Sequence, residues 1–369
     1  MSLELYGTLY PRLFSETIAA TGPGFDIAHI EQTARAHEAA GFDGVLLPHN
    51  AGWADNFLTV ARAAGVTRTL RFLLAHRPGF ISPTLAARKL ATLDHYTQGR
   101  LLLHVITGGR EQEQRRDGDY LAHDERYART DEYLHILRTL WASTGPVDHA
   151  GTHYRFEQGS HEPKPLQPGG ISISFGGASA AALEVAARHA DHYALWGESL
   201  DGTRELIGRV HEASARHGRK PGFSVSIRVV LGDTEAQAWA RARGIADETR
   251  QSGLWGRDSK VFGGIVPSDQ PENEGSRRLL AQIARGDVLD ERLYTGVARA
   301  TNAPGNTTAI VGPAEQVAQA LLKYVNAGVT RFLFRGFDPR TDAADFGRAL
   351  IPLLRAGAAR RSPADLAAA

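Results

Sequence analysis

Cysteine is absent from the 369 residues, which excludes disulfides, thiolate metal sites, a cysteine nucleophile and iron–sulfur clusters. An excess of charge is missing too, because 42 Lys and Arg stand against 41 Asp and Glu. We therefore expect neither nucleic acid nor a membrane as a partner. No apolar run approaches the roughly 18 residues of a membrane span, and the first residues lack a basic-then-apolar leader. These absences predict a cytoplasmic protein.

What the chain does contain is a regular alternation of short apolar runs with longer segments of helical period, which is typical of βα units around a parallel sheet. Eight such units predict an α/β fold, a (β/α)₈ TIM barrel, with a doubly wound open sheet as the alternative. The predicted strands are Leu3–Leu9, Gly44–Leu47, Leu70–Ala75, Arg100–Ile106, Ile171–Phe175, His192–Leu195, Phe223–Leu231 and Arg331–Phe334. The predicted helices are Asp26–Ala40, Pro83–His95, Arg129–Ala142, Ala178–His189, Thr203–His217, Thr234–Glu248, Ala314–Asn326 and Asp342–Leu354.

We expect one domain over residues 1–356 and a tail over 357–369. Two insertions interrupt the alternation. The first, about 110–170, carries a polar, hairpin-like piece after its helix, and the second, about 243–311, separates the seventh and eighth strands. Because long connections in compact domains often cover binding sites and this one is rich in glycine, we predict that the second insertion is a lid.

Polar and aromatic side chains stand at the carboxyl ends of the predicted strands, where barrels of this class hold their reacting groups. A single histidine near a strand end is more often a packing residue, but three successive strands end near one, which makes a shared site as good an interpretation as packing. The side chains at the strand ends are His49, His76, Arg77, His104, Thr107, Trp196, Glu198, Arg228 and Arg335.

The fifth strand leads into the turn "FGGAS", followed by a helix rich in small residues. Glycine lets the backbone approach a ligand closely, and the free N–H groups of a helix N-terminus favour an anion. Gly177, Ala178 and Ser179 are therefore candidates for a phosphate cradle.

Together these features resemble the flavin-dependent monooxygenases of the bacterial luciferase-like superfamily, and within it the FMNH2-dependent alkanesulfonate monooxygenases. Residues 70–109 carry Arg-Pro, Ser-Pro-Thr, Ala-Ala-Arg, Ala-Thr-Leu-Asp and Gly-Arg in the order of that family. The resemblance continues through "HDERYARTDEY", "ISFGGAS", "LWGE", "HGRK", "SIRVVL" and "TTAIVG", so it spans most of the chain.

The resemblance implies an FMN in the barrel mouth, beside a non-prolyl cis peptide that falls here at Ala75-His76. It places His104 where the family has a flavin-contacting asparagine. Tyr127 and Ser179 match residues that hold the FMN phosphate. We also expect Thr107, just after the fourth strand, to bind the cofactor.

The same resemblance assigns active-site roles. Trp196 and Arg228 match residues that line the site, and Arg299 is the nearest counterpart of an anion-binding arginine in the lid. A cysteine, a histidine and a tyrosine of the family are replaced here by Trp53, Val230 and Phe337. We hypothesise that His49 and His76 restore the lost acid–base capacity.

The function implied is a two-component monooxygenase that uses FMNH2 and O₂ to oxygenate a small anionic substrate. An alkanesulfonate or other organosulfonate would release sulfite and leave an aldehyde or carbonyl product. The implied partners are a separate NAD(P)H-dependent flavin reductase and further copies of the chain, as a homodimer or homotetramer. No metal is expected.

Three alternatives stay open. One is an oxidoreductase of the same fold that uses the deazaflavin F420. Another is a metal-dependent barrel hydrolase built on His49, His76 and His104, although the first strand lacks the usual His-x-His. The third is a flavin-binding barrel without catalysis.

Overall fold

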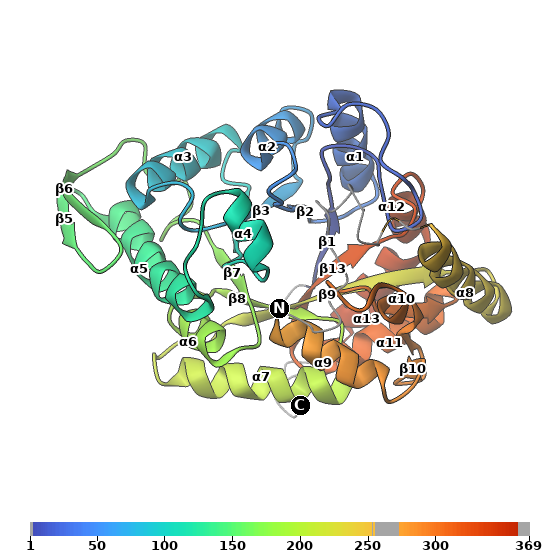
Figure 1. Cartoon of the computed structure of the whole chain (residues 1–369). Coiled ribbons are helices and arrows are strands. Elements are labelled where there is room, and N and C mark those ends of the chain that lie inside the picture. The colour runs from blue at the N-terminus through green and yellow to red at the C-terminus, as the bar shows by residue number, and fades with distance from the viewer. Residues whose placement is uncertain (1–2, 253, 255–272, 361–369) are drawn as a thin grey trace.

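The computed structural model describes residues 3–252, 254 and 273–360. Eight parallel strands close into a barrel, because β8, at one end of the order β9-β13-β1-β2-β3-β4-β7-β8, also pairs with β9 at the other end (Figure 1). The TIM barrel is thus confirmed, and the open sheet is excluded. The barrel strands in order are β1 Glu4–Thr8, β2 Gly44–Leu47, β3 Arg71–His76, β4 Leu101–Val105, β7 Ile173–Gly176, β8 His192–Trp196, β9 Gly222–Leu231 and β13 Val329–Arg335.

Helices surround the strands and bury their apolar faces against the outside of the barrel. Several begin where the sequence offers a side-chain cap; the carboxylate of Asp26, for example, accepts the backbone N–H of His29 at 3.0 Å. The helices are α1 Ile27–Ala39, α2 Asn56–Ala64, α3 Pro83–Tyr96, α4 Glu111–Arg116, α5 His123–Ala142, α6 Ala180–His189, α7 Leu200–Ala215, α8 Glu235–Gln251, α9 Glu274–Ile283, α10 Gly296–Thr301, α11 Ala314–Asn326, α12 Asp342–Asp345, the π-helical η1 Phe346–Leu350 and α13 Ile351–Ala359.

The first insertion contains α4, α5 and a two-stranded hairpin, as its polar pattern predicts. The hairpin stands at the periphery, beyond α5 (Figure 1). Its strands are β5 Val147–Ala150 and β6 Arg155–Gly159.

The second insertion joins the main sheet. Its last strand runs parallel to β9, and two short strands add to that edge in antiparallel order. They are β10 Val288–Leu289, β11 Leu293–Tyr294 and β12 Ala309–Gly312. Residue 253 and residues 255–272 of the predicted lid lie outside the described residues.

The strand β9 is ten residues long and has two different neighbours along one edge. Its first half pairs with β8 as far as Ser226, and from Arg228 onward that edge pairs with β12. One edge of β9 therefore changes its partner from β8 to β12 between Ser226 and Arg228, and we call this point the fork of the barrel wall. In the described part of the chain no helix has the length and apolar character needed to span a membrane.

Candidate active site

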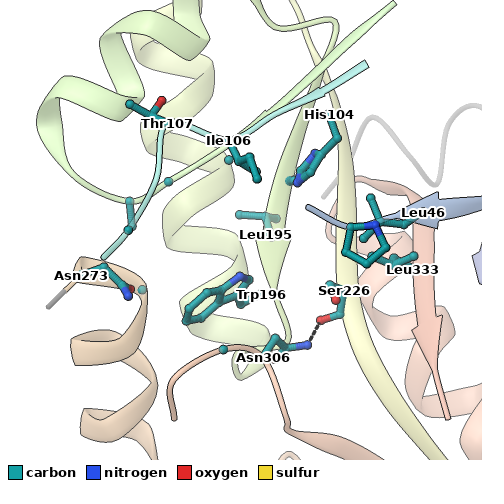
Figure 2. A pocket seen from close by; sticks show the side chains of 18 of the residues that line it. Leu46, His104, Ile106, Thr107, Leu195, Trp196, Ser226, Asn273, Asn306 and Leu333 are labelled. Carbon is teal, nitrogen blue, oxygen red and sulfur yellow. Dashed lines mark hydrogen bonds between the residues drawn. The ribbon is translucent and has the colours of Figure 1, made fainter. Parts of the chain in front are cut away.

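A cavity of about 480 Å³ opens at the carboxyl ends of the barrel strands, within the size range of small-molecule sites. Its walls are mixed: Leu46, Leu195 and Leu333 are apolar, whereas His104 and Ser226 present polar groups. Figure 2 shows these side chains, with Trp196, arranged around one hollow. The strand ends therefore meet at a single site, as the barrel geometry requires.

Eight of the twelve candidate residues line this cavity. They come from β2, β4, β7, β8, the segments that follow these strands, and α5. The eight are His49, His104, Thr107, Tyr127, Gly177, Ala178, Ser179 and Trp196.

His76 and Ala75 do not line the cavity. Alternation along β3 turns the His76 ring outward, where its Nε2 shares a hydrogen bond of 2.8 Å with the Tyr133 hydroxyl of α5. Burial, with some help from His49, lowers the pKa of His76 to about 3. An acid–base role at the mouth does not fit this placement.

The cis peptide expected at Ala75-His76 is wrong. The cis peptide bond in the described part of the chain is Glu162-Pro163. The ladder between β3 and β4 continues regularly through His76, opposite Val105, so the strand has no distortion at that bond.

Arg228 lies behind the cavity wall instead of in it. It donates one hydrogen bond to a Glu16 carboxylate oxygen and another, of 2.6 Å, to the Gly336 carbonyl. Its guanidinium lies 4.8 Å from the centre of the Phe337 ring. His104 and Ser179 thus converge on the cavity, whereas Arg228 forms a buried ion pair beside it.

Arg299, the expected lid arginine, also lies away from the cavity. It is on α10, where it donates to the Ile283 carbonyl at 2.9 Å and pairs with Asp287 at 2.8 Å. Half of its side chain is exposed. The second insertion contributes other residues to the wall, namely Asn273–Gly275 and Pro304–Asn306.

The three departures from the family pattern are packing residues. Trp53 packs on Tyr10 and Phe14, with ring centres 5.5 and 5.4 Å apart. Val230 and Phe337 are buried together in a second apolar cluster formed with α8 and β12.

The turn that enters α6 has the form of an anion cradle. Gly177 has φ +139°, and its carbonyl accepts a hydrogen bond from the Tyr193 hydroxyl. The Ser179 hydroxyl caps α6 by accepting the N–H of Ala182 at 3.2 Å. Tyr127 faces the turn, and burial raises the pKa of its phenol while a hydrogen bond with Ser179 opposes that rise. A neutral hydroxyl and free N–H groups therefore surround this part of the cavity.

Several buried polar atoms along the cavity wall have no hydrogen-bond partner among the described residues: His49 Nε2, His104 Nδ1, Thr107 Oγ1, and Nε and Nη1 of Arg77, of which Nη1 lies 4.0 Å from the Asp117 carboxylate. Buried polar groups are normally satisfied, so these atoms are available to hydrogen-bond a molecule bound in the cavity.

His49 and His104, two of the histidines that line the cavity, are held neutral. Burial, followed by the charge of Arg331, lowers the pKa of His104 to about 4. Burial and then the charge of Arg77 lower the pKa of His49. At neutral pH both rings therefore offer a donor or an acceptor without a charge.

This burial predicts a pH-dependent stability. The folded-state pKa of His104 is near 4 and the unfolded value is about 6.5, so the unfolded chain binds more protons between them. Stability falls as the pH drops from about 6.5 toward 4. We expect His104→Asn to reduce the loss of unfolding free energy between pH 7 and pH 5 by about 2 kcal/mol, measured by urea denaturation. Equal losses in the two proteins would contradict the buried, neutral state.

Structure adds wall residues that the sequence did not indicate. Glu113 of α4 pairs with Arg77 at 2.9 Å, and its carboxylate also accepts the N–H of Ala51. Asn306 fills the fork of the barrel wall: its amide donates to the Ser226 carbonyl and accepts the N–H of Gly197 at 3.2 Å (Figure 2). Glu113 lies on a short helix and Asn306 in a loop of the second insertion, and neither approach to a strand end has a periodic signal in the sequence.

The hydrolase alternative loses its basis in geometry. His76 faces α5, whereas His49 and His104 face the cavity. Over the described ranges, no three His, Asp or Glu side chains gather closely enough to hold a metal ion.

A sequence model described as luciferase-like monooxygenase matches residues 8–331. Among solved structures, riboflavin lyase (RcaE) with modified FMN and riboflavin superposes with a TM-score of 0.78, at 19% identity over 98% of this chain and 93% of that chain. DmoA from Hyphomicrobium sulfonivorans gives 0.75, at 21% identity over 98% and 90%. An F420-dependent secondary alcohol dehydrogenase with an F420-acetone adduct gives 0.69, at 17% identity over 96% and 99%. The structural likenesses establish a shared fold.

Proposed function

Because this chain belongs to the luciferase-like monooxygenase family, we propose that it is the oxygenating component of a two-component system that receives FMNH2 from a separate NAD(P)H-dependent flavin reductase. The proposed substrate is a small organic anion, such as an alkanesulfonate or another organosulfonate. The products would be sulfite and an aldehyde or carbonyl compound. A homodimer or homotetramer is the proposed assembly.

The observation that carries the proposal is the pairing, on one cavity, of an anion cradle with unsatisfied polar groups. Gly177, Ala178 and Ser179 present a helix N-terminus, and Tyr127 adds a hydroxyl. FMN has both a phosphate and a flat ring with polar edges, so it fits this combination. We propose that the cradle holds the phosphate and that His104 and Thr107 hydrogen-bond the ring.

Bound reduced FMN supplies the electrons that activate O₂, and the protein must keep water from the reacting groups. The apolar side chains Leu46, Leu195 and Leu333 line the hollow in which this chemistry would take place. Asn306 fixes one loop over the fork in the wall. Trp196 lies against Gly275 of α9, where an added Cβ would come within 3.1 Å of the ring. These contacts hold parts of the second insertion against the cavity wall.

The described residues also set limits on proton transfer. His49 and His104 are neutral near pH 7, so each ring offers one N–H donor and one acceptor nitrogen and adds no charge to the site. We propose that His49, whose Nε2 is free, contacts the substrate or O₂ and that Trp196 forms the packing surface for the substrate.

The test is a coupled assay with the purified full-length protein, FMN, NADH, a generic flavin reductase and a panel of organosulfonates. Mass spectrometry would follow oxygenated products, and a colour reaction would follow sulfite. We expect product only when FMN, reductase and O₂ are all present. Turnover with reduced F420 and none with FMNH2 would favour the deazaflavin alternative. Tight flavin binding without any product would favour a non-catalytic flavin carrier.

A further inference from the structure

Two arginines at the cavity, the buried Arg228 and the partly exposed Arg335, share one carboxylate. Arg228, at the middle of β9, and Arg335, at the end of β13, both pair with Glu16 from the loop after β1. The Arg228 pair is a direct hydrogen bond, and Arg335 Nη2 lies 3.8 Å from the same oxygen. The side chains of Arg228 and Glu16 are 2% and 1% exposed. The trio therefore carries one more positive than negative charge.

The neighbouring groups do not cancel this charge. Asp342, the next carboxylate that acts on Arg228, is itself paired with Arg241 at 2.7 Å. Tyr10 accepts a hydrogen bond from Arg335, and Phe337 offers Arg228 only a ring face. An unbalanced buried charge costs several kcal/mol, and a bound anion would offset that cost.

The excess charge faces the cavity through Arg335. Arg335 and Tyr10 line the cavity wall, whereas Arg228 stands behind it. The Nε of Arg335 is buried without a hydrogen-bond partner, although 20% of its side chain remains exposed. The guanidinium of Arg335 thus keeps one donor without a hydrogen-bond partner among the described residues, and part of this side chain is exposed at the cavity wall.

A second trio with the same composition serves as a comparison. Arg71 and Arg331 share Glu4 at 2.6 and 2.5 Å. Arg71 begins β3, at the opposite end of the barrel, and a third of its side chain is exposed, so water screens part of this trio's charge. Arg331 is buried and also lines the cavity, but its guanidinium is engaged: Nε and Nη2 face Glu4, and Nη1 donates to the Ser174 hydroxyl at 3.3 Å.

We propose that Arg335, assisted by the hydroxyl of Tyr10, binds the acidic group of the substrate, and that Glu16 and Arg228 hold Arg335 in place. The ligand class is a singly charged head group, a sulfonate or a carboxylate. The inference rests on the proposed function for its substrate, and it assigns the recognition of the anion to Arg335 in place of Arg228 or Arg299.

The test compares Arg335→Met with Arg299→Met, since both remove one positive charge but only Arg335 lines the cavity. The probes are hexanesulfonate, hexanoate and the uncharged hexyl methyl sulfone, each titrated by calorimetry into the full-length protein with FMN present. We expect the wild type and Arg299→Met to prefer an anion over the sulfone by at least about tenfold. Arg335→Met loses that preference and keeps its affinity for the sulfone and for FMN. Tyr10→Phe loses part of the preference.

Three results would overturn the assignment: a retained preference in Arg335→Met, an equal loss in Arg299→Met, or a wild type that binds neither anion better than the sulfone. The coupled assay separates this inference from the proposed function. A lost preference in Arg335→Met, with no oxygenated product from the wild type, would leave the anion subsite and reject the monooxygenase. If the wild type forms oxygenated product and Arg335→Met forms it equally well, the monooxygenase stands and the anion subsite at Arg335 is rejected.

Discussion

Replacing Glu16 by glutamine is expected to lower the free energy of unfolding by about 3–5 kcal/mol, because the substitution leaves the buried guanidinium of Arg228 without its counter-charge. Glutamine has the shape of glutamate, so packing is preserved and the lost charge is the main change. The carboxylate also faces Arg335, and its removal leaves two cations close together. Urea denaturation followed by circular dichroism would measure the effect.

The matched control is Glu111→Gln, which removes an equal charge from an exposed pair with Arg115. Exposed pairs contribute little, so its effect should stay below about 0.5 kcal/mol. Added hexanesulfonate should raise the melting temperature of Glu16→Gln more than that of the wild type, since an anion replaces part of the missing charge. A loss below about 1 kcal/mol in Glu16→Gln would show that the two arginines find other partners.

Gly177→Ala is expected to weaken FMN binding on the order of a hundredfold. The residue has φ +139°, a conformation that costs other residues about 1–3 kcal/mol. An added Cβ would also lie 2.7 Å from the Cβ of Ala182 and 3.0 Å from the Tyr127 hydroxyl. The turn must therefore shift, and its N–H groups leave the position that suits a phosphate. Fluorescence titration of FMN would measure the affinity.

Two variants bracket this result. Ser179→Ala removes one hydroxyl, which weakens FMN by about 1 kcal/mol and also removes the cap of α6. Gly218→Ala, with φ +64° and no atom within 4 Å of the added Cβ, introduces backbone strain far from the turn. FMN affinity should be unchanged in Gly218→Ala. An unchanged affinity in Gly177→Ala would place the phosphate elsewhere.

The barrel follows from local patterns, which explains why sequence predicted it well. Gly44–Leu47 and Ala314–Asn326 have the predicted ends, because apolar runs and helical periods are properties of neighbouring residues. The helix Asn56–Ala64 and the strand Ala309–Gly312 were missed. The former is a short connecting helix, and the latter belongs to an insertion that was expected to lie over the barrel, not in its sheet.

The cavity was predictable only as far as strand ends determine it. His49, His104 and Trp196 line the cavity because alternation and strand position direct them there. His76 and Arg228 also lie on barrel strands, but hydrogen-bond partners that are distant in sequence hold their side chains away from the cavity. No sequence motif predicts that Tyr133 pairs with His76 or that Glu16 pairs with Arg228.

The second insertion is joined to the barrel at the fork of its wall. The last strand of the insertion, β12, pairs with β9 from Arg228 onward, and the side chain of Asn306 bridges Ser226 of β9 and Gly197 after β8. The segment from Asn306 to Gly312 is therefore a part of the barrel wall. Replacing this segment would disturb the barrel itself, whereas changes at Asn273–Gly275, which line the cavity from the start of α9, would alter the shape of the site and leave the barrel intact.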